Sequence, residues 1–197
     1  LIIWKGDKLE KLSLNNEQSA KEAIKSIENS DLEVVKNEEK KEFRNPRAPF
    51  TTSTLQQEAK RKLNFSASRT MRAAQKLYEG LNIGSEVTGL ITYMRTDSVQ
   101  LSKDSITDLR EMITNEYGDN YCPEKFKIYK SKVANAQEAH EAIRPTDVKR
   151  MPKTVKAYLD DDCYKLYDLI WKRTVSSQMA SAIINKTTVD VESINKS

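Results

Sequence analysis

Arg44-Asn45-Pro46-Arg47-Ala48-Pro49 separates two kinds of sequence within the 197-residue chain. The hexapeptide contains two prolines and shows no helical or strand periodicity, which is typical of a domain boundary. Before it, short apolar runs indicate strands around one helix. After it, apolar residues recur three and four positions apart, which predicts helices. The sequence therefore predicts an α+β protein that is mainly helical.

The segment before the boundary predicts a small α+β unit. Two short runs around Gly6-Asp7 suggest a β-hairpin, and Asn16 has a side chain that suits a helix N-cap. The expected elements are a hairpin over Leu1–Leu14, a helix over Glu17–Ile27 and a strand over Leu32–Lys36.

The segment directly after the boundary predicts a pair of helices. Ser53 or Thr54 can cap the first helix, and Ser68 can cap the second. Two short helices separated by a short break resemble a helix-turn-helix, although most such pairs are packing units only. The expected helices span Leu55–Leu63 and Arg69–Glu79.

The rest of the chain alternates loops with helices and returns to a strand. Gly80–Gly89 contains three glycines and predicts a loop. The expected elements after it are a strand over Leu90–Met94, a helix over Lys103–Tyr117 capped by Ser102, a short helix over Ala136–Ile143, a long helix over Thr154–Gln178 whose buried stripe contains Cys163, Leu166, Tyr167 and Ile170, and a strand over Thr187–Glu192. Because both ends are β-rich, we expect residues 1–45 and 181–197 to form one discontinuous β domain, with a helical domain of residues 46–180 inserted between its halves.

The composition excludes several classes of protein. Hydrophobic residues make up 38% of the chain, which is enough for a core. The two cysteines, Cys122 and Cys163, have neither the spacing of zinc ligands nor the number of a disulfide framework. No apolar run approaches the ~20 residues of a membrane span, so we expect no membrane partner. The chain opens on Leu1 and not on Met, which suggests an excised piece of a longer protein.

The charge distribution suggests a polarised surface. The net charge is only +4, but Lys36–Lys76 holds 11 basic and 4 acidic residues, whereas Lys103–Glu124 holds 2 basic and 6 acidic ones. A phosphate-rich partner would bind the basic side. Two ordinary solvated faces would give the same pattern, so charge alone does not assign the partner.

The candidate chemistry lies in two clusters, Ile91–Ser98 (ITYMRTDS) and Ala136–Pro145 (AQEAHEAIRP). The sequence contains neither common type of phosphate-binding glycine loop and only one histidine, so neither nucleotide binding nor a zinc site is indicated. Considered alone, Tyr93 could be a core tyrosine and His140 an ordinary surface histidine.

The two clusters resemble the active-site signatures of bacterial type IA DNA topoisomerases. A third stretch, Pro49–Gln57 (PFTTSTLQQ), is similar to another signature of that family, and the three occur in the family's order. The resemblance implies that a helix-turn-helix-like helical domain bears the active-site tyrosine and is inserted into a smaller β-rich arch domain. It also implies that Tyr93, Arg95 and His140 are catalytic. Supporting or DNA-binding roles are implied for Asp97, Thr96, Arg144, Glu141, Gln57, Arg69 and Arg72.

The reaction that the resemblance implies is transient cleavage of one DNA strand. Tyr93 would attack the phosphorus, remain bonded to the 5′-phosphate and free a 3′-hydroxyl, while Arg95 would favour the phenolate and bind phosphate oxygens. One phosphodiester replaces another, so ATP is not required. Strand passage and religation would then relax negatively supercoiled DNA. We expect single-stranded or underwound DNA as the partner of a monomeric enzyme, located in the bacterial cytoplasm at the nucleoid.

The resemblance also implies Mg²⁺ in the intact enzyme, bound by an acidic domain upstream of Leu1. No such acidic triad is recognisable in the sequence, and Asp160-Asp161-Asp162 is better interpreted as a helix terminus or a solvated turn than as a Mg²⁺ site. We therefore expect no metal or other cofactor in this fragment, and we expect the fragment alone to be inactive.

Three alternatives stay open on the sequence alone. A tyrosine recombinase or type IB topoisomerase also uses a tyrosine with Arg and His partners, but it forms a 3′ link, and its Arg–His cluster precedes the tyrosine. A non-catalytic helix-turn-helix DNA-binding module would explain the basic segment but not the string around Tyr93. A plain helical interaction domain would bind no single-stranded DNA.

Overall fold

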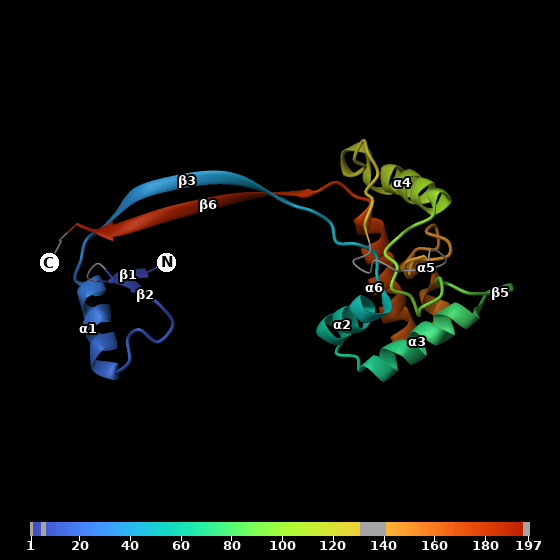
Figure 1. Ribbon diagram of the computed structural model, residues 1–197, viewed down its shortest axis with the longest axis horizontal. Coiled ribbons are helices and arrows are strands. Elements are labelled where there is room, and N and C mark those ends of the chain that lie inside the picture. The colour runs from blue at the N-terminus through green and yellow to red at the C-terminus, as the bar shows by residue number, and fades with distance from the viewer. Residues whose placement is uncertain (1, 5–6, 131–140, 195–197) are drawn as a thin grey trace. The chain divides into compact units, whose positions relative to one another are not determined.

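The computed structural model describes residues 2–4, 7–130 and 141–194. The chain divides into two compact units, one of residues 1–43 with 183–197 and one of residues 44–182 (Figure 1). The described part of the chain contains six α-helices and three two-stranded sheets, so the fold class is α+β.

The first unit contains a hairpin, one helix and a long two-stranded sheet. β1 (Ile2–Trp4) and β2 (Asp7–Leu9) pair antiparallel, so the predicted hairpin is confirmed, although its second strand includes Asp7 and ends at Leu9 and not at Leu14. α1 (Glu17–Glu28) begins at the predicted cap, where Asn16 Oδ1 accepts a hydrogen bond from Ser19 N at 2.7 Å. The long sheet pairs β3 (Leu32–Arg44) with β6 (Ala182–Ser193), which lie side by side in Figure 1.

Both strands of the long sheet extend well beyond the predicted ranges, Leu32–Lys36 and Thr187–Glu192. Their side chains are almost all exposed. A ladder whose faces are both open to solvent has no buried face, so it leaves no alternation of apolar and polar residues in the sequence. Backbone hydrogen bonds between the two strands therefore extend through residues that the sequence pattern could not assign.

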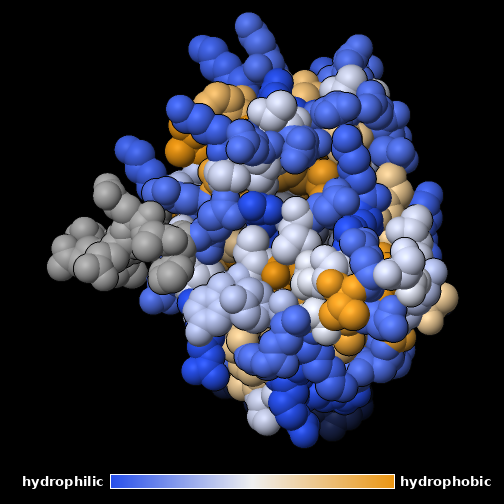
Figure 2. All heavy atoms as spheres, turned by 90° about the vertical axis from the view of Figure 1, so that its right-hand side faces the viewer, coloured by the Kyte–Doolittle hydropathy of each residue, from blue (hydrophilic) through white to orange (hydrophobic). Residues whose placement is uncertain are grey.

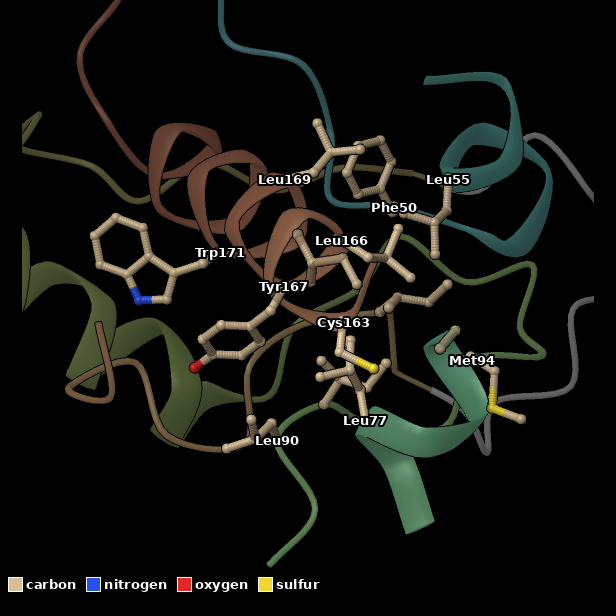
Figure 3. Packing of buried hydrophobic residues seen from close by; sticks show 14 of the residues in the cluster. Phe50, Leu55, Leu77, Leu90, Met94, Cys163, Leu166, Tyr167, Leu169 and Trp171 are labelled. Atoms are coloured by element: carbon tan, nitrogen blue, oxygen red, sulfur yellow. The ribbon is translucent and has the colours of Figure 1, made fainter. Parts of the chain in front are cut away.

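The second unit is built around α6 (Asp161–Ser177), which contacts α2, α3 and α5. Its predicted stripe is buried, and Figure 3 shows Phe50, Leu55, Leu77 and Met94 from other segments gathered near it. The face of the molecule in Figure 2 is mostly hydrophilic, with small scattered apolar groups. The remaining elements are α2 (Thr52–Leu63), α3 (Ala67–Glu79), β4 (Leu81–Ile83), β5 (Glu86–Thr88), α4 (Lys103–Tyr117) and α5 (Pro152–Val155).

The N-caps of α2 and α3 are not the predicted ones. Thr51 caps α2 in a capping box with Thr54, and Ser66 caps α3. Ser53 and Ser68, like Thr54, lie inside the helices. Several hydroxyl residues stand in a row at each helix start, and the cap is the one whose backbone is still extended. Which hydroxyl residue is the cap depends on the backbone conformation of the preceding loop, and local sequence does not predict that conformation.

The predicted strand over Leu90–Met94 is wrong. Ile91 makes an isolated antiparallel bridge to Pro145, and the ladder does not continue because Ile143 N donates its hydrogen bond to Phe50 O. The predicted glycine loop before this segment contains the hairpin of β4 and β5. The predicted helix over Lys103–Tyr117 is confirmed as α4, with Ser102 as its cap.

Two predicted helices also need correction. The long helix over Thr154–Gln178 is interrupted before α6, because Asp160 leaves the helical path and its Oδ1 accepts a hydrogen bond from Cys163 N at 2.8 Å. The aspartate run is therefore a helix terminus, as predicted. Of the expected helix over Ala136–Ile143, residues 141–143 are not helical, and residues 136–140 lie outside the described residues.

The cap of α3 gives a direct test. Ser66 Oγ accepts a hydrogen bond from Arg69 N at 3.2 Å, and no such role falls to Ser68. We expect Ser66→Ala to lower the free energy of unfolding by about 1 kcal/mol, measured by urea denaturation. Ser68→Ala is the matched control and should change it by less than about 0.5 kcal/mol. The reverse order of the two effects would show that α3 begins later.

Candidate active site

Three stretches that the sequence analysis connected with function meet in the second unit. Ile143 N donates a hydrogen bond to Phe50 O at 2.8 Å, which joins the Pro49–Gln57 stretch to the end of the second cluster. The bridge between Ile91 and Pro145 joins the same cluster to the first. The fold thus brings together segments that lie far apart along the chain.

Tyr93 lies on an irregular segment along which burial alternates. Met94 is buried and Thr96 is only 6% exposed, whereas Tyr93, Arg95 and Asp97 are exposed, with Tyr93 at 41%. The Met94 side chain reaches into the core (Figure 3), and the ring of Tyr93 is left accessible to a ligand.

Thr92 ties this segment to the second cluster. Its backbone N donates a hydrogen bond to Arg144 O at 2.9 Å, and its hydroxyl donates to Ala142 O at 2.7 Å. The same hydroxyl accepts a hydrogen bond from Arg144 N at 3.0 Å. The backbone on the N-terminal side of Tyr93 is therefore fixed to the segment that follows His140 in the sequence. His140 itself lies outside the described residues.

Thr52, the first residue of α2, ties the other side of the segment to the Pro49–Gln57 stretch. Its hydroxyl donates a hydrogen bond to Met94 O at 2.8 Å and accepts one from Thr96 N at 2.9 Å. Its backbone N donates to Thr96 O at 2.9 Å. Local sequence patterns did not single out Thr52, whose only signal was its place inside a family signature.

Tyr78 packs against the Tyr93 ring. Their ring centroids are 5.3 Å apart with an interplanar angle of 63°, an edge-to-face arrangement. Tyr78 belongs to the last turn of α3, where the returning chain passes very close. A Cβ at Gly89 would lie 2.5 Å from Tyr78 O, so the close approach requires glycine. Leu90 N then donates a hydrogen bond to Leu77 O at 2.7 Å.

Glu141 and Arg144 bind each other at the edge of the site. Arg144 Nη2 lies 2.6 Å from Glu141 Oε2, and Ser102 N donates a hydrogen bond to Glu141 Oε1 at 2.7 Å. Burial raises the pKa of Glu141, but the hydrogen bonds from Ser102 and the charge of Arg144 outweigh it and place the pKa below its usual value. The pair therefore anchors the second cluster to the N-terminus of α4.

Arg69 and Arg72 lie elsewhere on α3, beside the start of α6. Arg69 Nη2 is 2.6 Å from Asp162 Oδ1, and this hydrogen bond raises the pKa of the guanidinium. The two arginines share a pocket with Lys76 and the aspartates of residues 160–162, and the Tyr93 segment does not line it. Gln57 is exposed and donates a hydrogen bond to Ser53 Oγ at 3.3 Å.

The buried carboxylate of Glu58 forms ion pairs directly after the Pro49–Gln57 stretch. The Glu58 side chain is 8% exposed and faces three cations among the described residues: Arg61 Nη2 at 2.7 Å, Lys62 Nζ at 3.5 Å and Arg173 Nη2 at 3.4 Å. The Arg173 guanidinium also lies 4.3 Å from the centroid of the Phe50 ring. The hydrogen bond from Arg61 lowers the pKa of Glu58, against the opposing effect of burial.

A model of the DNA topoisomerase family matches residues 3–197. The chain belongs to this family. It is 54% identical over 189 residues to DNA topoisomerase 1 of Rickettsia felis, an alignment that covers 96% of this chain and 24% of that protein. It is 48% identical over 202 residues to DNA topoisomerase 1 of Xylella fastidiosa, covering 100% of this chain and 24% of that protein.

A solved structure of full-length topoisomerase I from Thermotoga maritima matches the fold of this topoisomerase chain. The TM-score is 0.76 at 39% sequence identity, over 88% of this chain and 27% of that one. The resemblance to bacterial type IA topoisomerases is therefore confirmed, in preference to a tyrosine recombinase or type IB enzyme. The chain spans 24% of the length of the two curated relatives, so it corresponds to a segment of them.

Two further findings concern metals and membranes. Within residues 2–4, 7–130 and 141–194, no group of three His, Cys, Asp or Glu side chains is placed so that it could hold a metal ion. None of the helices in the same ranges is long and apolar enough to cross a membrane.

The Glu58 cluster predicts a pH dependence of stability. Because the pKa of Glu58 is lower in the folded than in the unfolded chain, its ionised form stabilises the fold above pH ~4.5, and this contribution is lost as the pH falls through the folded pKa. We expect Glu58→Gln to lower the free energy of unfolding by about 1–3 kcal/mol at pH 7, since the three cations lose their buried counter-charge.

Urea unfolding at pH 7 and pH 3.5 measures this effect. The difference in stability between Glu58→Gln and the unsubstituted chain should shrink at the lower pH. Glu116→Gln removes an exposed carboxylate on α4 and should change stability by less than about 0.5 kcal/mol at either pH. The prediction would be contradicted if acidification lowered the free energy of unfolding equally in Glu58→Gln and in the unsubstituted chain.

Proposed function

We propose that this segment bears the nucleophile of a type IA DNA topoisomerase that relaxes negatively supercoiled DNA. The observation that carries the proposal is the exposed side chain of Tyr93, on a segment whose backbone is bonded on both sides to two other family signatures. A reacting group must be both accessible and held in position, and Tyr93 meets both requirements.

The proposed reaction exchanges one phosphodiester for another. Tyr93 Oη loses its proton and attacks a backbone phosphorus of one DNA strand, forming a bond to the 5′-phosphate. The bond from phosphorus to the 3′-oxygen breaks, and that oxygen leaves as a 3′-hydroxyl after taking up a proton. After the other strand has passed, the 3′-hydroxyl attacks the phosphotyrosine and restores the phosphodiester. Neither direction requires ATP, because the bond energies nearly match.

The residues near Tyr93 would assist its attack on the phosphorus. A phenol, with its pKa near 10, is a weak nucleophile at neutral pH, so it needs a cation that favours the charged transition state. Arg95 is exposed two residues away and would bind the phosphate oxygens through its N–H groups. His140 would donate to the phosphate or carry a proton. Asp97 and Thr96 would orient these groups.

The other site residues divide into two groups. Glu141 and Arg144 satisfy each other, so we propose that they hold the backbone and do not contact DNA. Gln57 and Arg72 are exposed and would face the DNA. Arg69 is paired through Nε and Nη2 with Asp162, whose negative charge weakens its attraction for a phosphate. Its DNA contact is therefore the weakest of these proposals, although α2 and α3 form the helix pair that the sequence predicted.

We further propose that residues 1–45 and 181–197 form the β-rich arch domain and that residues 46–180 form the tyrosine-bearing domain inserted into it. The division of the chain into two compact units supports this assignment. Movement of the inserted domain would open a gate for strand passage. The substrate would be single-stranded or underwound DNA, acted on by a monomer in the bacterial cytoplasm. Mg²⁺ would be bound by residues outside this chain, since the described residues do not offer a fitting site.

The nucleophile is tested by covalent capture in the full-length protein that contains this chain. Tyr93→Phe should abolish the covalent protein–DNA complex, because the ring is kept and only the attacking oxygen is lost. Tyr117→Phe is the matched control, since Tyr117 is exposed to a similar degree on α4 and should leave capture unchanged. With end-labelled DNA, the protein should be attached to the 5′ side of the break. A 3′ attachment, or capture by Tyr93→Phe, would refute the proposal.

The isolated chain gives a second test. We expect it neither to cleave nor to relax negatively supercoiled plasmid, because it spans 24% of the length of the full relatives and the described residues offer no metal site. The full-length protein is the positive control in the same agarose-gel assay. Relaxation by the isolated chain would show that everything needed for the reaction lies within its 197 residues.

A further inference from the structure

The Tyr93 segment depends on its neighbours for its shape. Residues 92–97 belong to no helix or strand, so no ladder of regular hydrogen bonds fixes the backbone there. On the N-terminal side of Tyr93, the hydrogen bonds are made by Thr92, which belongs to the segment itself. On the C-terminal side the bonds come from Thr52, which lies 42 positions from Met94 along the chain.

The Thr52 hydroxyl has the chemistry that this position needs. It donates its hydrogen to Met94 O at 2.8 Å and accepts the N–H of Thr96 at 2.9 Å, so one oxygen joins two backbone groups of opposite type. These groups lie on either side of Arg95. The hydroxyl therefore fixes the backbone that carries the Arg95 guanidinium, directly after the residue that carries the phenol.

The helix that carries Thr52 is itself held in place. Leu55 is fully buried in the core, and the Glu58 carboxylate on the same helix binds Arg173 of α6. Thr52 is therefore held rigidly by its helix, and its hydrogen bonds fix the position of the Tyr93 segment. A hydroxyl on a flexible loop would not have this effect.

We propose that Thr52 is a positioning residue for DNA cleavage, acting through its hydroxyl on the relative placement of Tyr93 and Arg95. The proposal rests on Tyr93 being the nucleophile. Without the hydroxyl, the partly buried Met94 O and Thr96 N would lose their partner, and the segment would shift to satisfy them elsewhere. Displacements of this kind slow reactions more than they weaken binding, because the reacting atoms must align.

The experiment compares four variants of the full-length protein that contains this chain. Thr52→Val has nearly the shape of threonine without the hydroxyl, Thr52→Ala removes the hydroxyl without adding bulk, and Thr52→Ser keeps the hydroxyl. Thr54→Val is the matched control, because the Thr54 hydroxyl serves only the capping box of the same helix. Two quantities are measured for each: the rate of covalent complex formation with end-labelled single-stranded DNA, and the dissociation constant of the noncovalent complex.

We expect Thr52→Val and Thr52→Ala to slow covalent complex formation on the order of 100-fold with an unchanged dissociation constant. Thr52→Ser should restore most of the rate, and Thr54→Val should lower the melting temperature without slowing the reaction. If Thr52→Val does not fold, Thr52→Ala and Thr52→Ser supply the comparison. Wild-type rates in both hydroxyl-free variants would overturn the proposal, as would equal losses in Thr54→Val. Failure of the unsubstituted protein to form any covalent complex would instead refute the role of Tyr93.

Discussion

Hydrogen bonds that join the start of α2 to two irregular segments are the constraint on which the site depends. Phe50, Thr52, Leu90, Thr92 and Ile143 contribute backbone or hydroxyl groups to a small set of hydrogen bonds that lie outside the regular helix and sheet ladders. Partly buried backbone groups must find partners. Here the partners belong to distant parts of the chain, and satisfying them brings the three family signatures together. The exposure of the Tyr93 side chain is a consequence of this arrangement.

The helices supply the rigid support that irregular segments lack. α6 runs through the core of the second unit and contacts α2 and α3, so the residues at the ends of those helices have defined positions. Thr52 starts α2, and Tyr78 ends α3. Both of these residues contact the Tyr93 segment. A site assembled from helix ends and short loops thus combines accessibility with fixed geometry, which a strand in the middle of a sheet could not offer.

Charge in this topoisomerase segment is used largely within the protein. Arg69 and Lys76 bind aspartates at the start of α6, Arg144 binds Glu141, and Arg173 binds Glu58. The basic character of Lys36–Lys76 therefore overstates the positive charge available to DNA. Arg95 is an exposed cation within a signature, and under the proposed function its position matters more for phosphate binding than the total charge.

The sequence by itself determined the α+β class, the helices α1 and α4 with their caps, the buried stripe of α6 and the family, because these depend on local spacing and on contiguous signatures. Only the tertiary structure decided that Thr51 and Ser66 are the caps, that Leu90–Met94 is not a strand, and that β3 and β6 are long. It also placed Thr52 on the Tyr93 segment and paired Arg69 with Asp162. Each of these depends on partners distant along the chain, which bring hydrogen-bond donors, acceptors and counter-charges that local sequence patterns do not encode.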